Sequence, residues 1–262
     1  MEPLELLKGV EAAARGAGQL MLSADHIADS VTDKAGHANF VTKYDKKVQA
    51  YLFESLASLL PQARFIGEED GADTFTPEDA SGFAFCIDPI DGTTNFLTGY
   101  RPSVTSIGLL KDGQPYLGVV YNPYQDMMFS ALQGKGATLN GAPIHSSSAP
   151  LNRSVVSFGT APYYAELQDR TFQLCKHYLG RCIDLRRSGA AAWDLCTVAM
   201  GVSGLFFEMK LGLWDYAAAA LIAAEAGCVL TDLEGGPLPF NGPSSMLCAS
   251  AGVAKEDYFP QV

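Results

Sequence analysis

The amino-acid sequence predicts an α+β protein whose helices and strands pack as layers in one compact body. Three observations lead to this prediction. Apolar residues near the N-terminus recur at helical spacing, the middle of the chain reads as a meander of strands, and helix-like and strand-like segments alternate after Pro150. An element with one apolar face must bury that face against another element, so layers are expected. The 262 residues contain no linker or repeat, and we treat residues 1–262 as one domain.

Two amphipathic helices are predicted at the N-terminus. The first ends near Ser30, and the second runs from near Tyr44 to Pro61, which cannot continue a helix. Apolar residues recur every three to four positions in both, so each helix should bury one face. The polar segment 31–39 between them is predicted as a surface loop.

Short strands separated by turns are predicted in the middle of the chain. Arg64 begins a strand that ends in consecutive acids, and Asn140-Gly141 is a hairpin signal. The strands of the meander are Val104–Leu110, Leu117–Tyr121 and Met127–Ala131.

The second half of the chain alternates between the two kinds of element and ends in a short helix. Its other helices are predicted over Tyr163–Leu179, Ala190–Met200 and Tyr216–Ala226. Its strands are predicted over Val155–Phe158, Ile183–Leu185, Leu205–Phe207, Cys228–Leu230 and Met246–Ala249.

Charge and composition argue against several classes of function. Lys and Arg total 18 against 29 Asp and Glu, which gives a net charge of −11. We therefore expect no nucleic-acid or membrane partner, and no apolar run approaches the roughly 20 residues of a membrane span. An acidic N-terminus and six cysteines without a CxxC pair indicate a cytoplasmic protein. An anionic substrate would need a local positive centre, which metal ions could supply.

The chain is organised around one segment, Phe83-Ala-Phe-Cys-Ile-Asp88-Pro-Ile-Asp91-Gly-Thr-Thr-Asn-Phe96. Its five apolar residues predict a buried strand, and Pro89 should stop that strand at Asp88 because proline cannot donate to a ladder. Thr93 is predicted as the N-cap of a short helix, where free N–H groups bind anions. Carboxylates beside an anion site are understandable if cations lie between them and a phosphate.

Each acid of interest also has an ordinary structural explanation. Asp215 precedes an alanine-rich run and could serve as an N-cap. The stretch Glu68-Glu69-Asp70 could be a solvated loop, and Asp88 and Asp91 could form an Asx-type turn.

The acids are more informative together than singly. Carboxylates gathered at 4 Å repel by ~1 kcal/mol per pair in water and ~4 kcal/mol at an effective dielectric constant of 20. Protons or hard cations must therefore lie among them. Oxygen ligands favour magnesium or manganese over zinc, and no histidine lies near these acids in the sequence.

At this point the sequence resembles the inositol monophosphatase family. Gly67-Glu68-Glu69 together with Asp88-Pro-Ile-Asp-Gly-Thr-Thr-Asn-Phe96 is similar to its paired signature, and Trp214-Asp215 to Gly227 resembles the second signature. Val41-Thr42-Lys-Tyr-Asp45 and the segment Arg186 to Asp194 with Glu208 also match, so the resemblance covers nearly the whole chain in order.

The resemblance implies an αβαβα sandwich, usually a homodimer, with Mg²⁺-dependent and often lithium-sensitive phosphomonoesterase activity. Residues 1–150 would hold metal and phosphate, and residues 151–262 would shape the substrate pocket. Two or three Mg²⁺ ions are implied. The metal ligands carried over by position are Glu68, Asp88, the carbonyl of Ile90, Asp91 and Asp215, with Asp88 bridging two ions.

The same resemblance assigns catalytic and substrate-binding roles. Asp45 and Thr93 would orient a metal-activated water. Glu69 would support the metal ligands without contacting the metal itself. Substrate contacts are implied for Gly92, Thr93, Thr160, Gly189, Ala191 and Glu208. Lys34 matches a lysine of a mobile loop near the active site, and a solvated surface lysine is the alternative.

The expected substrate is inositol 1-phosphate or a similar polyol or sugar phosphate. Glu208 is acceptor-only when ionised and suits a diol, and Thr94-Asn95 stands where nucleotide-cleaving relatives tend to have Lys-Glu. Histidinol phosphate and fructose 1,6-bisphosphate are the alternatives among enzymes. A non-catalytic regulatory protein is the other class, since some bacterial members of the family act by contact with transcription machinery.

Overall fold

The computed structural model describes residues 2–27, 31–33, 40–70 and 81–258. Its helices are α1 (Pro3–Leu22), α2 (Lys43–Leu59), α3 (Thr93–Thr98), α4 (Gln168–Leu179), α5 (Ala191–Ala199) and α6 (Leu213–Glu225). A seven-stranded sheet has the order β3-β4-β5-β6-β7-β8-β9, a five-stranded sheet the order β11-β10-β12-β14-β13, and β1 pairs with β2.

The strands of the seven-stranded sheet are β3 (Arg64–Gly67), β4 (Phe83–Asp91), β5 (Val104–Lys111), β6 (Gln114–Asn122), β7 (Met127–Leu132), β8 (Ala137–Leu139) and β9 (Ala142–Ile144). Those of the five-stranded sheet are β10 (Val155–Phe158), β11 (Asp184–Arg186), β12 (Ser203–Leu211), β13 (Val229–Thr231) and β14 (Ser244–Ala249). The small pair consists of β1 (Val31–Asp33) and β2 (Phe40–Thr42).

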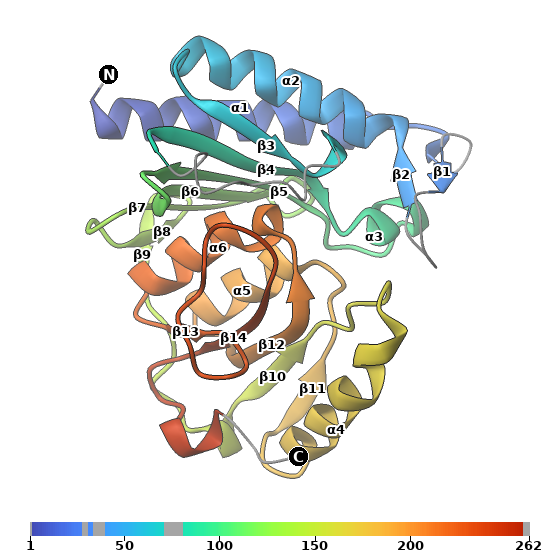
Figure 1. The fold of residues 1–262 in the computed structure, drawn as a ribbon, viewed down its shortest axis with the longest axis vertical. Helices are drawn as coiled ribbons and strands as arrows, with labels where there is room; N and C mark the ends of the chain where they lie inside the picture. Colours follow the sequence, from blue (N-terminus) through green and yellow to red (C-terminus); the bar gives the residue numbers. More distant parts are fainter. Residues whose placement is uncertain (1, 28–30, 34–39, 71–80, 259–262) are drawn as a thin grey trace.

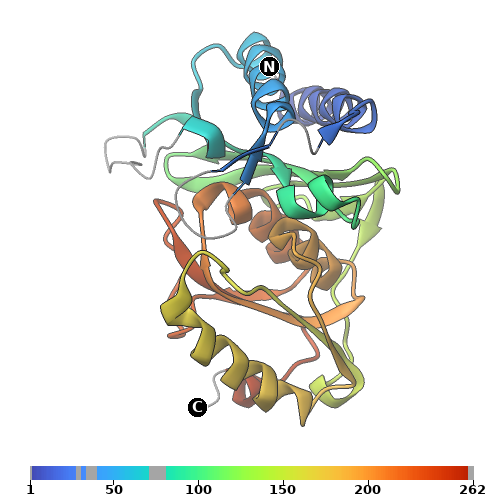
Figure 2. The same ribbon diagram turned by 90° about the vertical axis from the view of Figure 1, so that its right-hand side faces the viewer.

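The two large sheets and the helices form five layers, which confirms the predicted αβαβα sandwich. Helices α1 and α2 cover one face of the seven-stranded sheet, and α5 and α6 lie between its other face and the five-stranded sheet (Figures 1 and 2). Helix α4 covers the outer face of the five-stranded sheet. Alternation along β4 shows the cause, because Phe85 and Ile87 face α1 and α2 while Ala84 and Cys86 face α6.

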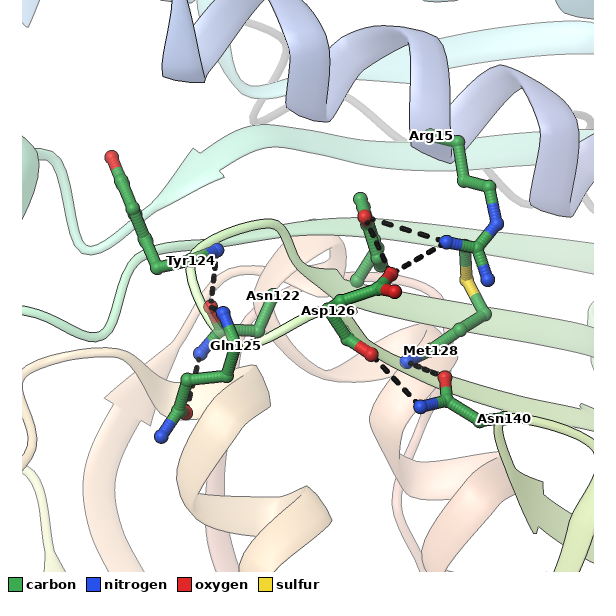
Figure 3. A network of polar contacts seen from close by, with 8 residues as sticks. Arg15, Asn122, Tyr124, Gln125, Asp126, Met128 and Asn140 are labelled. Carbon is green, nitrogen blue, oxygen red and sulfur yellow. Dashed lines mark hydrogen bonds and ion pairs between the residues drawn. The ribbon is translucent and has the colours of Figure 1, made fainter.

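The turn after β6 is fixed to α1 by a polar network (Figure 3). Asp126 accepts hydrogen bonds from Arg15 at 2.6 Å and from the Tyr121 hydroxyl at 3.0 Å, and these bonds hold its pKa below the usual value. Asn140 donates to the Asp126 carbonyl and accepts from the Met128 N–H, both at 2.8 Å. The turn therefore joins the first helix to the β8–β9 hairpin, whose predicted Asn140-Gly141 turn is confirmed by positive φ values of 50° and 80°.

Helix α6 approaches the seven-stranded sheet unusually closely. Gly108 and Gly118 are register partners on β5 and β6, and a methyl group on Gly118 would lie 2.5 Å from the Ala218 carbonyl oxygen. A methyl group on Gly108 would lie 2.9 Å from the Ala217 Cβ. Glycine on the sheet and alanine on the helix thus remove the side chains that would hold the two backbones apart. This contact fixes the start of α6, where Asp215 lies.

Several predicted boundaries were wrong. The first helix ends at Leu22 rather than near Ser30, because Ser23 caps it with its N–H bonded to Gln19 and its hydroxyl to Leu20. Helix α4 begins at Gln168 rather than at Tyr163, after a short 3₁₀ turn. The predicted C-terminal helix is a single 3₁₀ turn at Lys255–Asp257. The segment predicted as a loop begins with strand β1, and residues 34–39 lie outside the described residues.

All six cysteines are free thiols, as expected from their spacing. Across the described ranges, the helices are too short or too polar for any of them to span a lipid bilayer.

The close approach of α6 predicts that Gly118→Ala destabilises the fold. The added methyl group meets backbone rather than a movable side chain, so we expect a loss of about 3 kcal/mol and a melting point several degrees lower. Gly242→Ala is the matched control, because nothing lies within 4 Å of its added methyl group. Equal urea-unfolding midpoints for the two variants would contradict this account of the packing.

Candidate active site

The end of β4 carries the first two acids. The strand does not stop at Asp88, as Pro89 led us to predict, but continues to Asp91 through a register shift against β5. The shift is a bulge, which tolerates a proline because the bulged residues leave the ladder. Asp88 accepts a hydrogen bond from the Ile90 N–H at 3.0 Å, the Asx-type contact that the sequence left open. Both acids are buried.

Gly92 turns the chain from β4 into α3. Its φ of 87° is in the left-handed region, where glycine is favoured, and Gly92 is therefore the N-cap. The prediction that Thr93 is the N-cap was wrong, since Thr93 is the first helical residue. The Thr93 hydroxyl is thereby released from capping and faces other partners.

Asp45 and Thr93 meet although 48 positions separate them. The Thr93 hydroxyl donates to Asp45 Oδ1 at 3.3 Å and to the Ile90 carbonyl at 3.2 Å. The other oxygen of Asp45 accepts from the N–H of Thr42 at 2.7 Å and its hydroxyl at 2.6 Å, which completes a capping box at the start of α2. The capping box holds the buried carboxylate so that one oxygen faces Thr93.

Asp91 reaches across to the N-terminus of α5. Its two oxygens accept hydrogen bonds from the N–H groups of Ala191 at 3.1 Å and Ala192 at 2.7 Å. Burial nevertheless raises the pKa of Asp91 to about 7, because it outweighs the stabilisation from these donors. The first half of the chain is thus joined to the second at the predicted site.

Asp215 lies in the first turn of α6. The N-cap is Gly212, so the prediction that Asp215 caps the helix was wrong by three positions. Asp215 instead accepts from the Gly212 N–H at 2.7 Å, as the third helical residue of a capping box does. Burial raises the pKa of Asp215, and the nearby charges of Asp91 and Glu68 raise it further.

Glu68 and Glu69 form a short 3₁₀ turn after β3 and are half-buried rather than fully solvated. The Glu69 N–H donates to Gln49 of α2 at 3.1 Å, and Gly67 leaves room for that glutamine. The turn is thereby held against α2. Glu68 comes near enough to Asp45, Asp88, Asp91 and Asp215 for its charge to raise the pKa of each.

Carboxylates from four elements therefore share one electrostatic environment. The pKa of Asp88 is raised first by burial and then by Glu68, Asp91, Asp215 and Asp45, all of them acids. This donor set of oxygens suits a hard cation such as Mg²⁺. Among the described residues, however, no three His, Cys, Asp or Glu side chains lie close enough as they stand to hold a metal ion.

Glu208 is the acid of the predicted substrate positions. It is buried on β12, accepts a hydrogen bond from the Ala161 N–H at 3.0 Å, and has a pKa raised by burial to about 7. A methyl group on Gly159 would lie 1.9 Å from Glu208 Oε2, so the Glu208 carboxyl group occupies the space that a side chain at position 159 would need. Thr160 lies between the two residues that contact Glu208 and is half-buried.

Gly92 and Gly189 bring the turn between β4 and α3 into contact with the loop before α5. A methyl group on Gly92 would lie 3.3 Å from the Gly189 carbonyl oxygen and 3.1 Å from the Cβ of Ala190, the next residue in the chain. Asn95, which the sequence connected only with the choice of substrate, donates to the Ser188 carbonyl at 2.9 Å and to the Pro102 carbonyl at 2.6 Å. Its place inside the Asp-Gly-Thr-Thr-Asn motif was the available signal.

Two further residues near the site were missed. Asp194, four positions into α5, accepts from the Ser188 hydroxyl at 2.6 Å and so fixes the loop before the helix. No sequence pattern predicts this contact. Thr42, by contrast, could have been found from the Thr-x-x-Asp spacing of a capping box. Lys34 lies outside the described residues.

One protein family and several of its members resemble this chain over most of its length. A profile of the inositol monophosphatase family matches residues 2–262. Nus factor SuhB of Escherichia coli (strain K12) is 36% identical over 227 residues, which are 86% of this chain and 84% of that protein. Inositol monophosphatase 1 of Solanum lycopersicum is 38% identical over 227 residues, 85% of this chain and 82% of that protein.

Solved structures resemble the whole fold. The extragenic suppressor protein suhB from Bartonella henselae has a TM-score of 0.85 and 29% sequence identity, with 95% of each chain covered. The inositol monophosphatase from Anabaena has a TM-score of 0.81 and 28% identity, covering 97% of this chain and 94% of that one.

The raised pKa of Glu208 predicts that this residue lowers the free energy of unfolding as pH rises, and that Glu208→Gln removes this effect. Between its ordinary value of 4.5 and about 7, the unfolded chain loses this proton first, so stability falls as pH rises and the loss is complete above 7. The shift amounts to about 3 kcal/mol. Glutamine can still accept from Ala161, so the variant should gain stability relative to the wild type by about that amount between pH 4.5 and 8.

Urea unfolding across this pH range measures the difference. Glu166→Gln serves as the control, because Glu166 is exposed on a 3₁₀ turn and its variant should follow the wild type. Parallel stability curves for Glu208→Gln and the wild type would show that Glu208 ionises as freely as an exposed glutamate.

Proposed function

This chain belongs to the inositol monophosphatase family, and we propose that it is a Mg²⁺-dependent phosphomonoesterase acting on inositol 1-phosphate or a similar polyol or sugar phosphate. The observation that carries the proposal is the gathering of acids that raise one another's pKa, namely the buried Asp88 and Asp91 at the end of β4 and the half-buried Asp215 at the start of α6. Like charges in a buried site are costly unless protons or cations compensate them.

We assign the ion-binding role to the acids and to one carbonyl. The proposed ligands of two Mg²⁺ ions are Glu68, Asp88, the carbonyl of Ile90, Asp91 and Asp215, and a third ion would involve Glu68. Bound Mg²⁺ would neutralise these carboxylates, draw phosphate oxygens to the site and lower the pKa of water. The oxygen-only donor set supports magnesium over zinc.

Asp45 and Thr93 would prepare the attacking water. The Thr93 hydroxyl donates to either Asp45 or Ile90, so its oxygen can accept a hydrogen bond from a water beside it. Burial raises the pKa of Asp45, which would make its carboxylate a stronger base for a proton passed on by Thr93. Glu69, on the turn fixed to Gln49, would support the ligands from behind.

The phosphate and the alcohol would lie on opposite sides of the Gly92–Gly189 contact. The N–H groups of Gly92 and Thr93 start α3 and would donate to phosphate oxygens. Glu208, when ionised, accepts only, so it selects an alcohol with hydroxyl donors. Thr160, Gly189 and Ala191 would complete the substrate contacts; the direct neighbours of Thr160 and Gly189 contact Glu208 and Gly92.

The proposal also covers the roles of the two halves of the chain, its location and assembly, and its inhibition by lithium. Residues 1–150 would bind metal and phosphate, and residues 151–262 would bind the alcohol. The exception is Asp215, a proposed metal ligand that belongs to the second part. We expect a cytoplasmic homodimer, in keeping with free thiols and with the family. Lithium would inhibit by competing for a magnesium position.

A second candidate is a regulatory protein that works by binding a macromolecular partner. The relatives named Nus factor SuhB favour it, and they bear directly on our expectation of no nucleic-acid partner. The net charge of −11 counts against direct binding to nucleic acid but not against a protein partner.

Phosphate release from a panel of esters tests the enzyme proposal. With magnesium, we expect turnover of inositol 1-phosphate or another polyol phosphate, and a loss of more than about a hundredfold in Asp88→Asn, because a proposed bridging ligand is weakened. Asp169→Asn, an exposed acid of α4, should retain wild-type rates. If no ester, including histidinol phosphate and fructose 1,6-bisphosphate, is hydrolysed, the enzyme proposal fails. A cellular function that survives Asp88→Asn would favour the regulatory candidate.

Magnesium should also stabilise the fold. At a hundred times its dissociation constant the ion adds about 2.7 kcal/mol, or several degrees in melting temperature for a chain of this size. Asp91→Asn should abolish this increment, and Asp169→Asn should keep it. Melting temperatures that do not change from chelator to millimolar magnesium would contradict the proposed ion site, whatever the activity.

A further inference from the structure

Asp194 is a buried acid to which the proposed mechanism gives no role. Its side chain is 4% exposed, although it belongs neither to the proposed metal ligands nor to the substrate contacts. Burial raises the pKa of Asp194, a hydrogen bond from Ser188 lowers it, and the charges of Glu208 and Asp91 raise it further. A carboxylate is costly to bury unless its contacts compensate for the lost water. The contacts of Asp194 therefore indicate what this residue does.

The partner of Asp194 is Ser188, in the loop before α5. The Ser188 hydroxyl donates to Asp194 Oδ2 at 2.6 Å and accepts from the Ala190 N–H at 3.1 Å. The Ser188 carbonyl accepts from Asn95 of α3 at 2.9 Å. A charged acceptor makes a stronger hydrogen bond than a neutral one. Asp194 thus holds the residue that in turn holds Ala190, the N-cap position of α5.

Helix α5 has no cap from its own sequence. Ala190 has no side-chain oxygen to accept from the first N–H groups of the helix. These groups instead donate to Asp91 of β4, from Ala191 at 3.1 Å and from Ala192 at 2.7 Å, and a third hydrogen bond comes from the Trp193 N–H. Asp91 therefore caps α5 from another element. The orientation of the Asp91 carboxylate consequently depends on where the backbone of α5 begins.

We propose that Asp194 is a positioning residue for Asp91, which acts through Ser188 by fixing the start of α5. This inference rests on the proposed function, in which Asp91 is a ligand of Mg²⁺. It adds to that site a residue that contacts neither the ion nor the substrate. A ligand whose outer partners hold it in place binds a metal more tightly, since less freedom is lost when the ion binds.

Hydrogen exchange in the presence of a chelator tests the proposed chain of contacts. Ser188→Ala removes the hydroxyl that joins Asp194 to Ala190, so the first N–H groups of α5 should exchange about tenfold faster than in the wild type, as measured by NMR. Ser188→Thr keeps the hydroxyl and should restore slow exchange. Ser154→Ala is the matched control, because it removes a buried hydroxyl with one hydrogen bond before the first residue of β10. It should leave these exchange rates unchanged.

A magnesium titration of the melting temperature tests whether the same contacts serve the ion site. The Mg²⁺ concentration that gives half of the rise should increase about threefold or more in Ser188→Ala and in Asp194→Asn, because Asp91 is held less firmly. The variant with both substitutions should need no more magnesium than Ser188→Ala alone, because one residue acts through the other. Ser154→Ala should keep the wild-type concentration.

The remaining outcomes separate this inference from the proposed function. Unchanged exchange in Ser188→Ala overturns the inference. Faster exchange with an unchanged magnesium requirement also overturns it, because Asp194 would then be purely structural, while the ion site stands. Effects that multiply in the double variant show that Asp194 does not act through Ser188. If magnesium does not raise the melting temperature of the wild type, the proposed ion site fails, and the exchange rates alone decide whether Asp194 fixes the contact between Asp91 and α5.

Discussion

The contact between α6 and the seven-stranded sheet is the constraint on which the site depends. Gly108 and Gly118 form one bare patch across β5 and β6, and the Ala217-Ala218 backbone lies directly on it. The Ser106 hydroxyl, one step along β5, donates to the Trp214 carbonyl at 3.3 Å and fixes the start of the helix. Since Asp88 is the register partner of Ser106, this contact sets where Asp215 lies relative to Asp88. An acid from each half of the chain is thus brought to the same place by packing alone.

Burying these acids opposes folding, and the surrounding backbone offsets only part of that cost. Asp91 accepts hydrogen bonds from two N–H groups of α5, Asp215 accepts one from the Gly212 N–H, and Asp45 accepts from Thr42. Even so, burial dominates the pKa of every one of them and raises it. Protons or cations that bind these groups in the folded state therefore stabilise that state relative to the unfolded chain. That affinity is the physical link between the stability of this chain and its proposed chemistry.

Local patterns predicted the layers well but not the geometry of the site. Periodicity identified most elements because burial on one face leaves a local trace, as in β4, where neighbouring residues face different layers. The bulge at Pro89 and the left-handed Gly92 left no such trace, since the register against β5 and the contact with Ala190 come from residues distant in sequence. Asp215 was placed at the wrong helical position because both N-cap and third-residue acids stabilise a helix start. Which acids belong together came from the resemblance to a family.

The loop before α5 shows how specificity can be separated from the reacting centre. Its backbone is held on one side by Asn95 of α3 and on the other by the buried Asp194. Under the proposed function, such a doubly anchored loop could not shift toward one substrate without disturbing the turn to which we assign phosphate. Selectivity between alcohols would then depend on side chains that project from the fixed backbone, and Glu208, which fills the space beside Gly159, is the charged one that we assign to the alcohol.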